Sequence, residues 1–550
     1  MFRKSTNKTQ LGIFSSPNLY LSGRSESFYE KKDAWHNLFR VHVISRIDES
    51  IFKPLFTEQT GSPNASVRVL IGMMILKEGN GWSDQQLFEH CRFNLLVRRA
   101  LGLVNMDDAI PTESTYYLFR KRIVEYEKAN TINLFEKTFS SVTAGQVSDF
   151  NVSGKSIRMD SKLLGSNIAW LSRYELIHET LRLFCQDVKD TLITHSLSPS
   201  ETMLVENLLK EKGNKVVYRS THDEVKTKIQ ELGWLTYKLI QFFNSSSSKH
   251  YLTLNRVFSD QFIVDENKIV IARSKEEISS QSVQSPHDTD CHYRNKDGNQ
   301  VKGYSINVTE SCDKQELNLI THVDVNVVTT PDNDFLQNSI NETKEIIVNA
   351  IENLHADGAY HSSGNQEFCR KENIDLIINA IQGPKGRYDL FLDKDNQLTV
   401  VDTITNETVI AKKQNNEDKW RIKTAEHYRY FTTKEITACS LRRKIDAIPQ
   451  EILNIRNNVE ATIFQLGFHY NNSKSRYRGL IKHKMWANIR CLWVNFVRIV
   501  MLNPITMKIN RFFQINNPKT KFIFAIEVAI INFKVFLLEP KNNYRKTQFV

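Results

Sequence analysis

The sequence predicts an α/β protein in which an all-α domain precedes a mixed β-sheet that carries one helical and one β-rich insertion. Apolar residues recur at helical spacing through residues 31–130. Two β-rich runs, 301–312 and 317–328, flank Asp313-Lys314-Gln315, which is typical of a hairpin. A helix over 332–354, a strand that ends at Asp357 and an apolar run at 374–381 follow. This order of elements favours a mixed sheet.

The first 130 residues predict a helical region with a basic surface. Residues 1–30 are polar and rich in Ser and Asn, which predicts a flexible N-terminus. Within 31–130, short helices with tight turns suit a helix-turn-helix-like DNA-binding domain. An ordinary helical bundle with a solvated basic face fits the same periodicity. The candidate DNA contacts here are Arg98, Arg99, Arg120 and Arg122.

The sheet-forming region spans residues 150–500 and contains both insertions. The first, at about 165–285, has helical periodicity over 171–193, 201–212 and 222–243. The second, at about 385–445, has short strand-like runs at 398–401 and 408–410. Residues 503–550 form a basic C-terminal tail that ends with Lys541-Asn-Asn-Tyr-Arg-Lys546. The composition of the insertions does not indicate what they do.

Three short segments each carry one carboxylate in a distinctive setting. In Ile157-Arg-Met-Asp160, the apolar residues alternate with the charged ones, so a strand would turn Asp160 away from the core. Asp357 follows a short strand and precedes Gly358, where the backbone turns. Arg456 and Glu460 are four residues apart and share one side of a predicted amphipathic helix that begins after Pro449.

Each of these acids also has a purely structural interpretation when taken alone. Asp160 could cap a strand end, Asp357 could be a turn residue, and Glu460 could be half of a surface ion pair with Arg456. Together, two strand-borne aspartates and a helix-borne glutamate can converge on a pair of divalent cations. Carboxylate oxygens are ligands that Mg²⁺ prefers. Two such ions support an in-line phosphoryl displacement.

The ordered set resembles the DDE transposases of bacterial insertion sequences, which have an RNase H-like catalytic domain. The resemblance covers roughly residues 30 to 500. Its matching segments are Ile157 to Ser161 with Leu164-Gly-Ser-Asn-Ile168, Gly303-Tyr-Ser305, Ala356-Asp-Gly-Ala-Tyr360, Arg456-Asn-Asn-Val-Glu460, Arg476-Tyr-Arg-Gly-Leu480 and Asn495-Phe-Val-Arg498. Relatives that process their ends through a DNA hairpin carry Tyr and Lys where this chain has Leu453 and Gly467, which puts a hairpin route in doubt.

The resemblance implies a DNA transposase that binds the terminal inverted repeats of its element and catalyses metal-dependent cleavage and strand transfer. It implies an RNase H-like fold over 150–500, the triad Asp160, Asp357 and Glu460, and two Mg²⁺ ions, with Mn²⁺ as an alternative. The expected partners are double-stranded DNA at the element ends and target, and further copies of the chain in a homodimer or higher oligomer on DNA. Two other hypotheses remain: a catalytically silent DNA-binding protein descended from a transposase, and a structure-selective nuclease with the same triad.

Charge supports a polyanionic partner. The chain has 73 Lys and Arg against 62 Asp and Glu, a net charge of +11, and such an excess favours salt-sensitive binding to nucleic acid. Cations and aromatic rings interleave over 470–486, which suits a DNA-contacting face, although a solvated helix face is the alternative. The candidate contacts in this later region are Arg456, Arg476, Arg478 and Lys482.

Cysteine usage and hydropathy favour a cytoplasmic protein, and the resemblance implies that it associates with the nucleoid. The seven cysteines are scattered and form no C-x-x-C pair, as expected in a reducing compartment. His287, Cys291 and His292 lack the partner pair that a zinc site needs. The start of the chain has no apolar signal-peptide core. The apolar run 522–538 contains Glu527 and Lys534, which argues against a membrane span.

Overall fold

The computed structural model describes residues 1–5, 12, 14–58, 60–193, 197–244, 246–296, 298–314, 317–381, 383, 385–393, 395–414, 419–424, 427–467 and 474–514. Its centre is a mixed sheet in the order β6 (Ile320–Val327), β5 (Asn299–Ser311), β1 (Ser156–Gly165), β7 (Asn353–Ala356) and β8 (Asp375–Ile378). β6, β5 and β1 are antiparallel neighbours, whereas β1, β7 and β8 are parallel. β4 (His292–Lys296) pairs with the start of β5. The predicted mixed sheet and its hairpin are confirmed.

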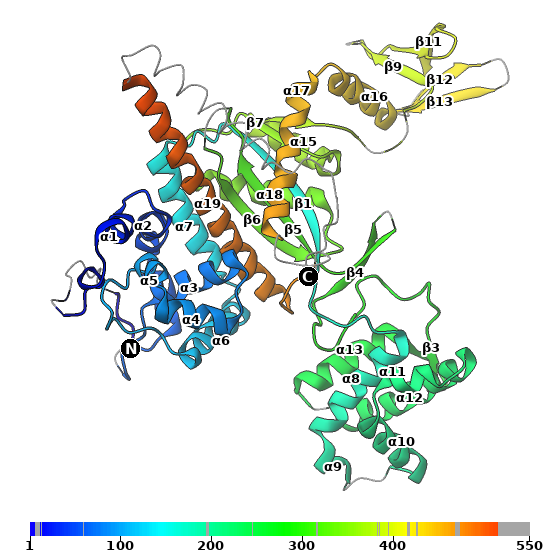
Figure 1. Ribbon diagram of the computed structural model, residues 1–550. Coiled ribbons are helices and arrows are strands. Elements are labelled where there is room, and N and C mark those ends of the chain that lie inside the picture. Colours follow the sequence, from blue (N-terminus) through cyan, green and yellow to red (C-terminus); the bar gives the residue numbers. More distant parts are fainter. Residues whose placement is uncertain are drawn as a thin grey trace.

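Helices cover both faces of this sheet (Figure 1). Alternation along β1 places Ile157 and Met159 in a core with Phe335, Leu336 and Ile340. That face is covered by α14 (Leu336–Lys344), preceded by η4 (Asp332–Phe335), and by α15 (Ser363–Lys371), which follows η5 (Gly358–Tyr360). On the other face lie α7 (Leu134–Phe150), α18 (Asn458–Leu466) and the long α19 (Leu480–Gln514).

The N-terminal region is all-α, as predicted, but it is not a separate body. Its helices are α1 (Gly23–Glu30), α2 (Trp35–His42), α3 (Val67–Asn80), α4 (Asp84–Phe93), α5 (Leu95–Ala100) and α6 (Glu113–Asn130), with the short η1 (Pro17–Leu19), η2 (Ile44–Arg46) and η3 (Glu49–Leu55). One continuous core joins Leu70 of α3, Val308 of β5 and Trp486 of α19. Gly79 lets the ring of Trp493 pack directly on α3, where any Cβ would clash.

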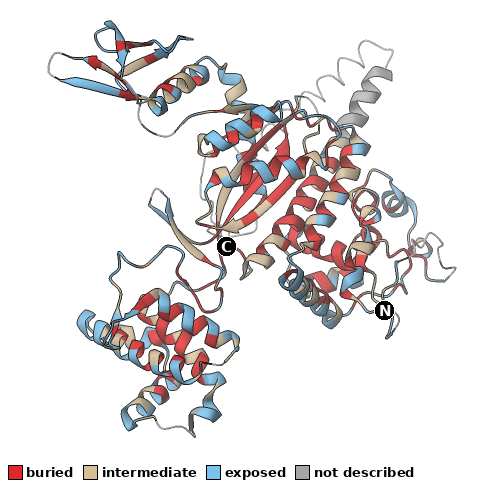
Figure 2. Ribbon diagram, turned by 180° about the vertical axis from the view of Figure 1, so that it is seen from behind, coloured by how far each residue is buried: buried red, intermediate tan, exposed pale blue. Residues whose placement is uncertain are grey.

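The helical insertion has its own core and projects away from the sheet (Figures 1 and 2). Leu181, Phe184, Leu235 and Leu254 lie in that core. Its elements are α8 (Arg173–Asp187), α9 (Lys189–Ile193), α10 (Pro199–Lys210), α11 (Gly213–Tyr218), α12 (His222–Phe242), α13 (Lys249–Gln261), β2 (Phe262–Val264) and β3 (Val270–Ala272). The three predicted helices are present, although the first is split into α8 and α9.

The β-rich insertion is an antiparallel meander with one helix packed on it. Its strands are β9 (Tyr388–Leu392), β10 (Leu398–Asp402), β11 (Thr408–Lys413), β12 (Lys419–Lys423) and β13 (Tyr428–Thr432), and α16 (Thr433–Asp446) follows. Leu398, Val400, Trp420 and Phe431 form a core with Ile436 and Cys439 of α16. Two insertions therefore fold around cores of their own, whereas the N-terminal helices do not.

One predicted helix end is wrong, and three other regions differ in detail from what the sequence indicated. The predicted 332–354 helix ends at Lys344, because the backbone N–H groups of Glu352 and Asn353 donate to the carbonyl of Lys155 as the chain enters β7. The predicted helix after Pro449 is interrupted: α17 (Gln450–Leu453), η6 (Asn454–Asn457) and α18 follow one another. The N-terminus expected to be flexible contains η1 and α1. The predicted tail at 503–550 begins inside α19, and residues 515–550 lie outside the described residues.

Within the described residues, Leu480–Leu502 of α19 is long and apolar enough to cross a membrane by length and composition alone. Most of this segment is buried inside the protein, between α3, α7 and the sheet. The apolar run 522–538 lies outside the described residues.

Candidate active site

Two neighbouring parallel strands bring the predicted aspartates to one place. Arg158 of β1 is in register with His355 of β7. Asp160, in the middle of β1, and Asp357, just after β7, each lie two residues further along, so their backbones are side by side. Asp160 sits within β1 rather than at its end, which removes the strand-cap interpretation. Asp357 follows β7 directly, and its carboxylate accepts a 2.6 Å hydrogen bond from the N–H of Gly358.

Arg456 gathers all three predicted acids around one guanidinium. Its Nη1 lies 3.3 Å from Asp160 Oδ2 and 4.0 Å from Asp357 Oδ2, and its Nη2 lies 2.8 Å from Glu460 Oε1. Arg456 is in η6 and Glu460 in α18, one helical turn apart, so they share a side as predicted. The three segments therefore meet in space, with one positive charge among three negative ones.

The environment of Asp160 disfavours its charged form. Its side chain is 16% exposed, and burial raises its pKa to about 6, although Arg456 and the N–H of Ser161 act in the opposite direction. The carboxylates of Asp357 and Glu460 add to the raised pKa. The single guanidinium of Arg456 therefore does not balance the charge of the three carboxylates.

The donor set suits a hard divalent cation, because it consists of carboxylates without imidazole or thiolate. In the described part of the chain, no three His, Cys, Asp or Glu side chains are arranged to hold a metal ion as they stand. The acids converge on Arg456 instead, so a bound cation would replace its guanidinium as their counter-charge. His287, Cys291 and His292 do not form a metal site either: His287 faces Glu179, and His292 faces Thr329.

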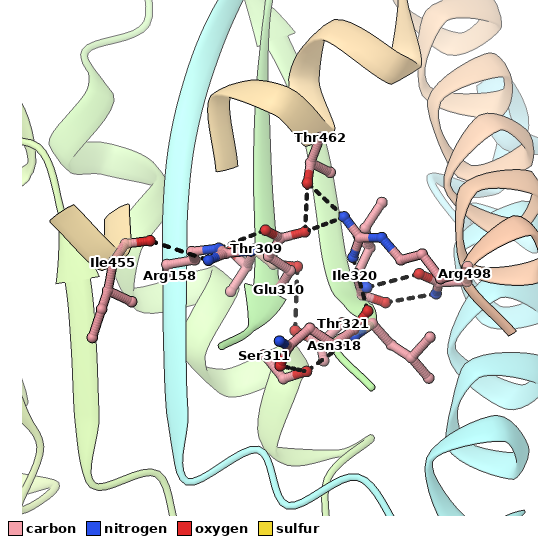
Figure 3. Close-up of polar contacts among 12 residues, drawn as sticks. Arg158, Thr309, Glu310, Ser311, Asn318, Ile320, Thr321, Ile455, Thr462 and Arg498 are labelled. Carbon is pink, nitrogen blue, oxygen red and sulfur yellow. Dashed lines mark hydrogen bonds and ion pairs between the residues drawn. The ribbon is translucent and has the colours of Figure 1, made fainter. Parts of the chain in front are cut away.

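A further carboxylate, that of Glu310, lies on the same face of the sheet as Asp160, and it was not predicted from the sequence. Figure 3 shows its contacts. Glu310 of β5 is fully buried, with no exposed side-chain surface. Its Oε1 accepts a 2.6 Å hydrogen bond from Arg158 Nε, and its Oε2 accepts from Arg498 Nη2 at 2.7 Å and from Thr462 Oγ1 at 2.8 Å. Burial acts to raise the pKa of Glu310, but Arg498, Arg158 and Thr462 together hold it below its usual value.

The Glu310 network joins the elements that carry the candidate active site. Arg158 is two residues before Asp160, and its Nη1 donates to the carbonyl of Ile455, the neighbour of Arg456, at 3.1 Å. Thr462 is two residues after Glu460. Arg498 of α19 also donates to the carbonyl of Asn318 at 3.0 Å. Glu310 therefore fixes η6 and α18 against β1, and it helps to position Asp160, Arg456 and Glu460.

The sequence contained one signal for this network, a charged residue within the β-rich run 301–312. Alternation along that run cannot tell whether Glu310 faces solvent or the interior. The resemblance included Arg498 without a role, and Arg158 only as a neighbour of Asp160. Their shared partner is visible only when β1, β5 and α19 are placed together.

Two predicted DNA contacts are corrected by their burial. The guanidinium of Arg98 donates to the carbonyls of Asn105, Met106 and Asp108 at 2.8 to 3.1 Å. Arg99 donates to Asn37 at 3.0 Å and to Glu30 at 2.8 Å. Both side chains are almost fully buried, so they hold loops and α1 in place and do not present charge to a phosphate.

Arg456 lies among the three acids, but the other predicted contacts lie closer to the surface, and several gather in one basic cluster. Arg120 of α6 packs between the rings of Tyr116 and Tyr477. Arg478 donates to the carbonyl of Asn167 at 2.6 Å, and Arg476 to those of Gly81 and Trp82. Partial burial lowers the pKa of Lys482, and so do its neighbours Arg120, Lys128, Lys249 and Arg478. Arg122 stands apart, over the ring of Phe56.

The seven cysteines are buried and free, each as a thiol without a disulfide. They are scattered over separate cores, as the spacing in the sequence indicated. Burial raises the pKa of the Cys185 thiol to about 12.

Residues 26–122 match the family described as "Transposase domain (DUF772)". The match supports a transposase. It covers the N-terminal helices from α1 into α6, including the surface cation Arg120, and ends before β1. No curated protein and no solved structure matches the chain.

Proposed function

We propose that this chain is a DNA transposase of the DDE type, which binds the terminal inverted repeats of its insertion sequence and carries out metal-dependent cleavage and strand transfer. The observation that carries the proposal is the meeting of Asp160, Asp357 and Glu460 around Arg456. The strand order β6-β5-β1-β7-β8 supports an RNase H-like core. In it, β5 is antiparallel to both β6 and β1, and β7 and β8 continue the sheet parallel to β1. The match over 26–122 adds support from a part of the chain that contains none of these acids.

In this proposal the acids bind Mg²⁺, with Mn²⁺ as an alternative. Two bound ions supply charge stabilisation for the attacking and leaving oxygens of a phosphodiester. Asp160 and Asp357 hold the metal from rigid strands, and Glu460 completes the site from α18. Arg456 pairs with the acids and then holds Glu460 or contacts a phosphate. Arg158, Glu310 and Thr462 keep the strand and helix at a constant separation.

DNA would contact the basic cluster that α6, the 474–479 segment and the start of α19 form together. Arg120, Arg478 and Lys482 lie there, and in the described residues none of them has an acid within ion-pair distance. Arg476 extends this surface, and Arg122 would be a separate contact. We place the protein on the nucleoid in the cytoplasm, where it would work as a homodimer or higher oligomer on element ends.

The test is cleavage of labelled DNA that carries the sequences flanking the coding region. Asp160→Ala and Asp357→Ala abolish cleavage in Mg²⁺ but retain DNA binding, because metal ligands do not read bases. Asp375→Ala is the matched control, since Asp375 is an exposed aspartate at the start of the adjacent strand β8. Ca²⁺ supports binding without turnover, because its longer and looser coordination fits in-line displacement poorly.

Three results would overturn the proposal. Full cleavage in EDTA or by the Asp160 variant would exclude a carboxylate-bound metal. If wild-type protein binds the ends specifically but does not cleave them in Mg²⁺ or Mn²⁺, the remaining hypothesis is a catalytically silent DNA-binding protein. Cleavage of branched DNA without preference for element ends would favour the structure-selective nuclease.

A further inference from the structure

Among the described residues, no element covers one face of the sheet in the β-rich insertion. α16 packs on the face that carries Leu398, Trp420 and Phe431. Residues directly opposite each other on neighbouring strands share a face. Lys412 pairs with Arg421, Arg421 with Tyr430, and Lys423 with Tyr428, so these side chains lie together on the opposite face. We call this surface the open face, and Ile410 and Lys419 also belong to it by alternation.

The open face combines exposed rings with positive charge. Tyr428 is 51% exposed and Tyr430 is 44% exposed. The open-face strand positions of β11, β12 and β13 carry four cations, Lys412, Lys419, Arg421 and Lys423, and no acid. Lys412, Arg421 and Lys423 have no acid within ion-pair distance among the described residues. The guanidinium of Arg421 lies 5.2 Å from the centre of the Tyr428 ring.

We propose that the open face binds a DNA strand with unpaired bases. Cations at every second residue of β12 match the repeating phosphates of a strand, and rings between them offer surfaces on which bases stack. An intact duplex hides the faces of its bases, so it could use the cations but not the rings. The charge of the surface selects a polyanion over an apolar protein partner.

The place of the insertion in the chain connects this surface with the candidate active site. The insertion begins after β8, the neighbour of the Asp357 strand, and ends at α17, which leads through η6 to Glu460. It projects outward from that end of the sheet (Figure 1). The inference that the strand comes from a DNA end opened during cleavage rests on the proposed function. The inference that the open face binds unpaired bases does not.

The test uses the full chain and a fluorescein-labelled oligothymidylate, with binding measured by fluorescence anisotropy. Tyr428→Ala together with Tyr430→Ala weakens binding by roughly tenfold or more, the scale expected when stacking rings are removed. Replacing both residues by Phe retains the rings and most of the affinity. Tyr218→Ala is the matched control, because Tyr218 is 91% exposed on the helical insertion. Its affinity stays at the wild-type value.

A second readout locates the contact. Thymidine replaced by 5-iododeoxyuridine cross-links to nearby aromatic residues under ultraviolet light, and the cross-linked peptide should span β12 and β13. Cross-links only elsewhere, or unchanged affinity in the double Ala variant, would overturn the proposal. The proposal would also be overturned if a duplex of the same length bound with equal affinity and lost the same affinity in the double Ala variant. That result would show phosphate binding without base stacking. None of these outcomes depends on cleavage, so Asp160→Ala protein gives the same binding result if the active-site proposal fails.

Discussion

Two carboxylate–arginine clusters lie on one face of the same strands, and they differ in charge and in access. At Glu310, two arginines enclose one fully buried carboxylate, and its pKa lies below the usual value. At Arg456, one arginine serves three carboxylates, and the pKa of Asp160 is raised to about 6. Asp357 and Glu460 remain partly exposed. The first cluster is closed and neutralised, whereas the second is open and lacks positive charge.

This difference indicates that the Glu310 cluster has a structural role and that the Arg456 cluster is able to bind a cation. A buried carboxylate with all its hydrogen bonds made holds strands and helices together and has nothing further to bind. A group of acids that lacks a counter-charge and can be reached from solvent is able to take up a cation. Arg158 and Asp160, two residues apart on β1, carry the two functions side by side.

Glu310→Gln should have the largest effect on stability. The change retains the shape but leaves Arg158 and Arg498 buried without a counter-charge, so it should lower the free energy of unfolding by about 3–5 kcal/mol. Urea denaturation measures the loss. Glu352→Gln is the control, since Glu352 pairs with Lys155 at the surface at 2.8 Å and should change stability by about 0–1 kcal/mol. Equal losses in the two variants would erase the distinction between the clusters.

Arg456→Ala should lower stability less, and the loss should depend on metal. Removing the guanidinium leaves three acids together, at a cost of about 1–3 kcal/mol in EDTA. Mg²⁺ should then raise the melting temperature more in this variant than in wild type, because binding stabilises the folded state. Arg456→Lys, which retains the charge, is the control. An equal response to Mg²⁺ in all three proteins would show that Arg456 does not occupy the cation site.

Thr462→Val should have the smallest effect on stability and a distinct effect on cleavage. The hydroxyl joins α18 to Glu310, and its loss costs about 1 kcal/mol. Cleavage should fall because Glu460, two residues earlier, loses its position. Thr321→Val is the matched control: its buried hydroxyl bonds to Thr309 and Thr343, away from α18. Stability losses of similar size with cleavage reduced in both variants would argue against a positioning role for Thr462.

The succession of strands and helices along the sheet-forming region could be predicted, as could the neighbouring positions of Arg456 and Glu460, because both rest on local patterns. Alternation at Ile157 to Asp160 placed the carboxylate away from the core, and four-residue spacing placed Arg456 beside Glu460. The hairpin of β5 and β6 and two strands of the second insertion, β10 and β11, were visible in the same way. These features depend on residues close in sequence, where periodicity carries the information.

Features that depend on distant residues could not be predicted. Arg98 and Arg99 look like surface cations until the loop at 105–108 and α1 enclose them. The helix after Pro449 is interrupted at η6. There Arg158, from a strand about three hundred residues earlier, donates a hydrogen bond to the carbonyl of Ile455. The N-terminal helices share a core with β5 and α19, although nothing near residue 130 distinguishes that arrangement from an independent domain.

The most direct test of the central claim locates the cation itself. Fe²⁺ can replace Mg²⁺ at carboxylate sites, and with ascorbate and peroxide it cuts the backbone next to where it is bound. Wild-type protein should be cut near residues 160, 357 and 460, and excess Mg²⁺ should suppress all three cuts. Asp160→Asn should lose them, and Glu352→Gln should retain them. Cuts at other positions only, or cuts at these three that persist in Asp160→Asn, would contradict a metal centre held by Asp160, Asp357 and Glu460.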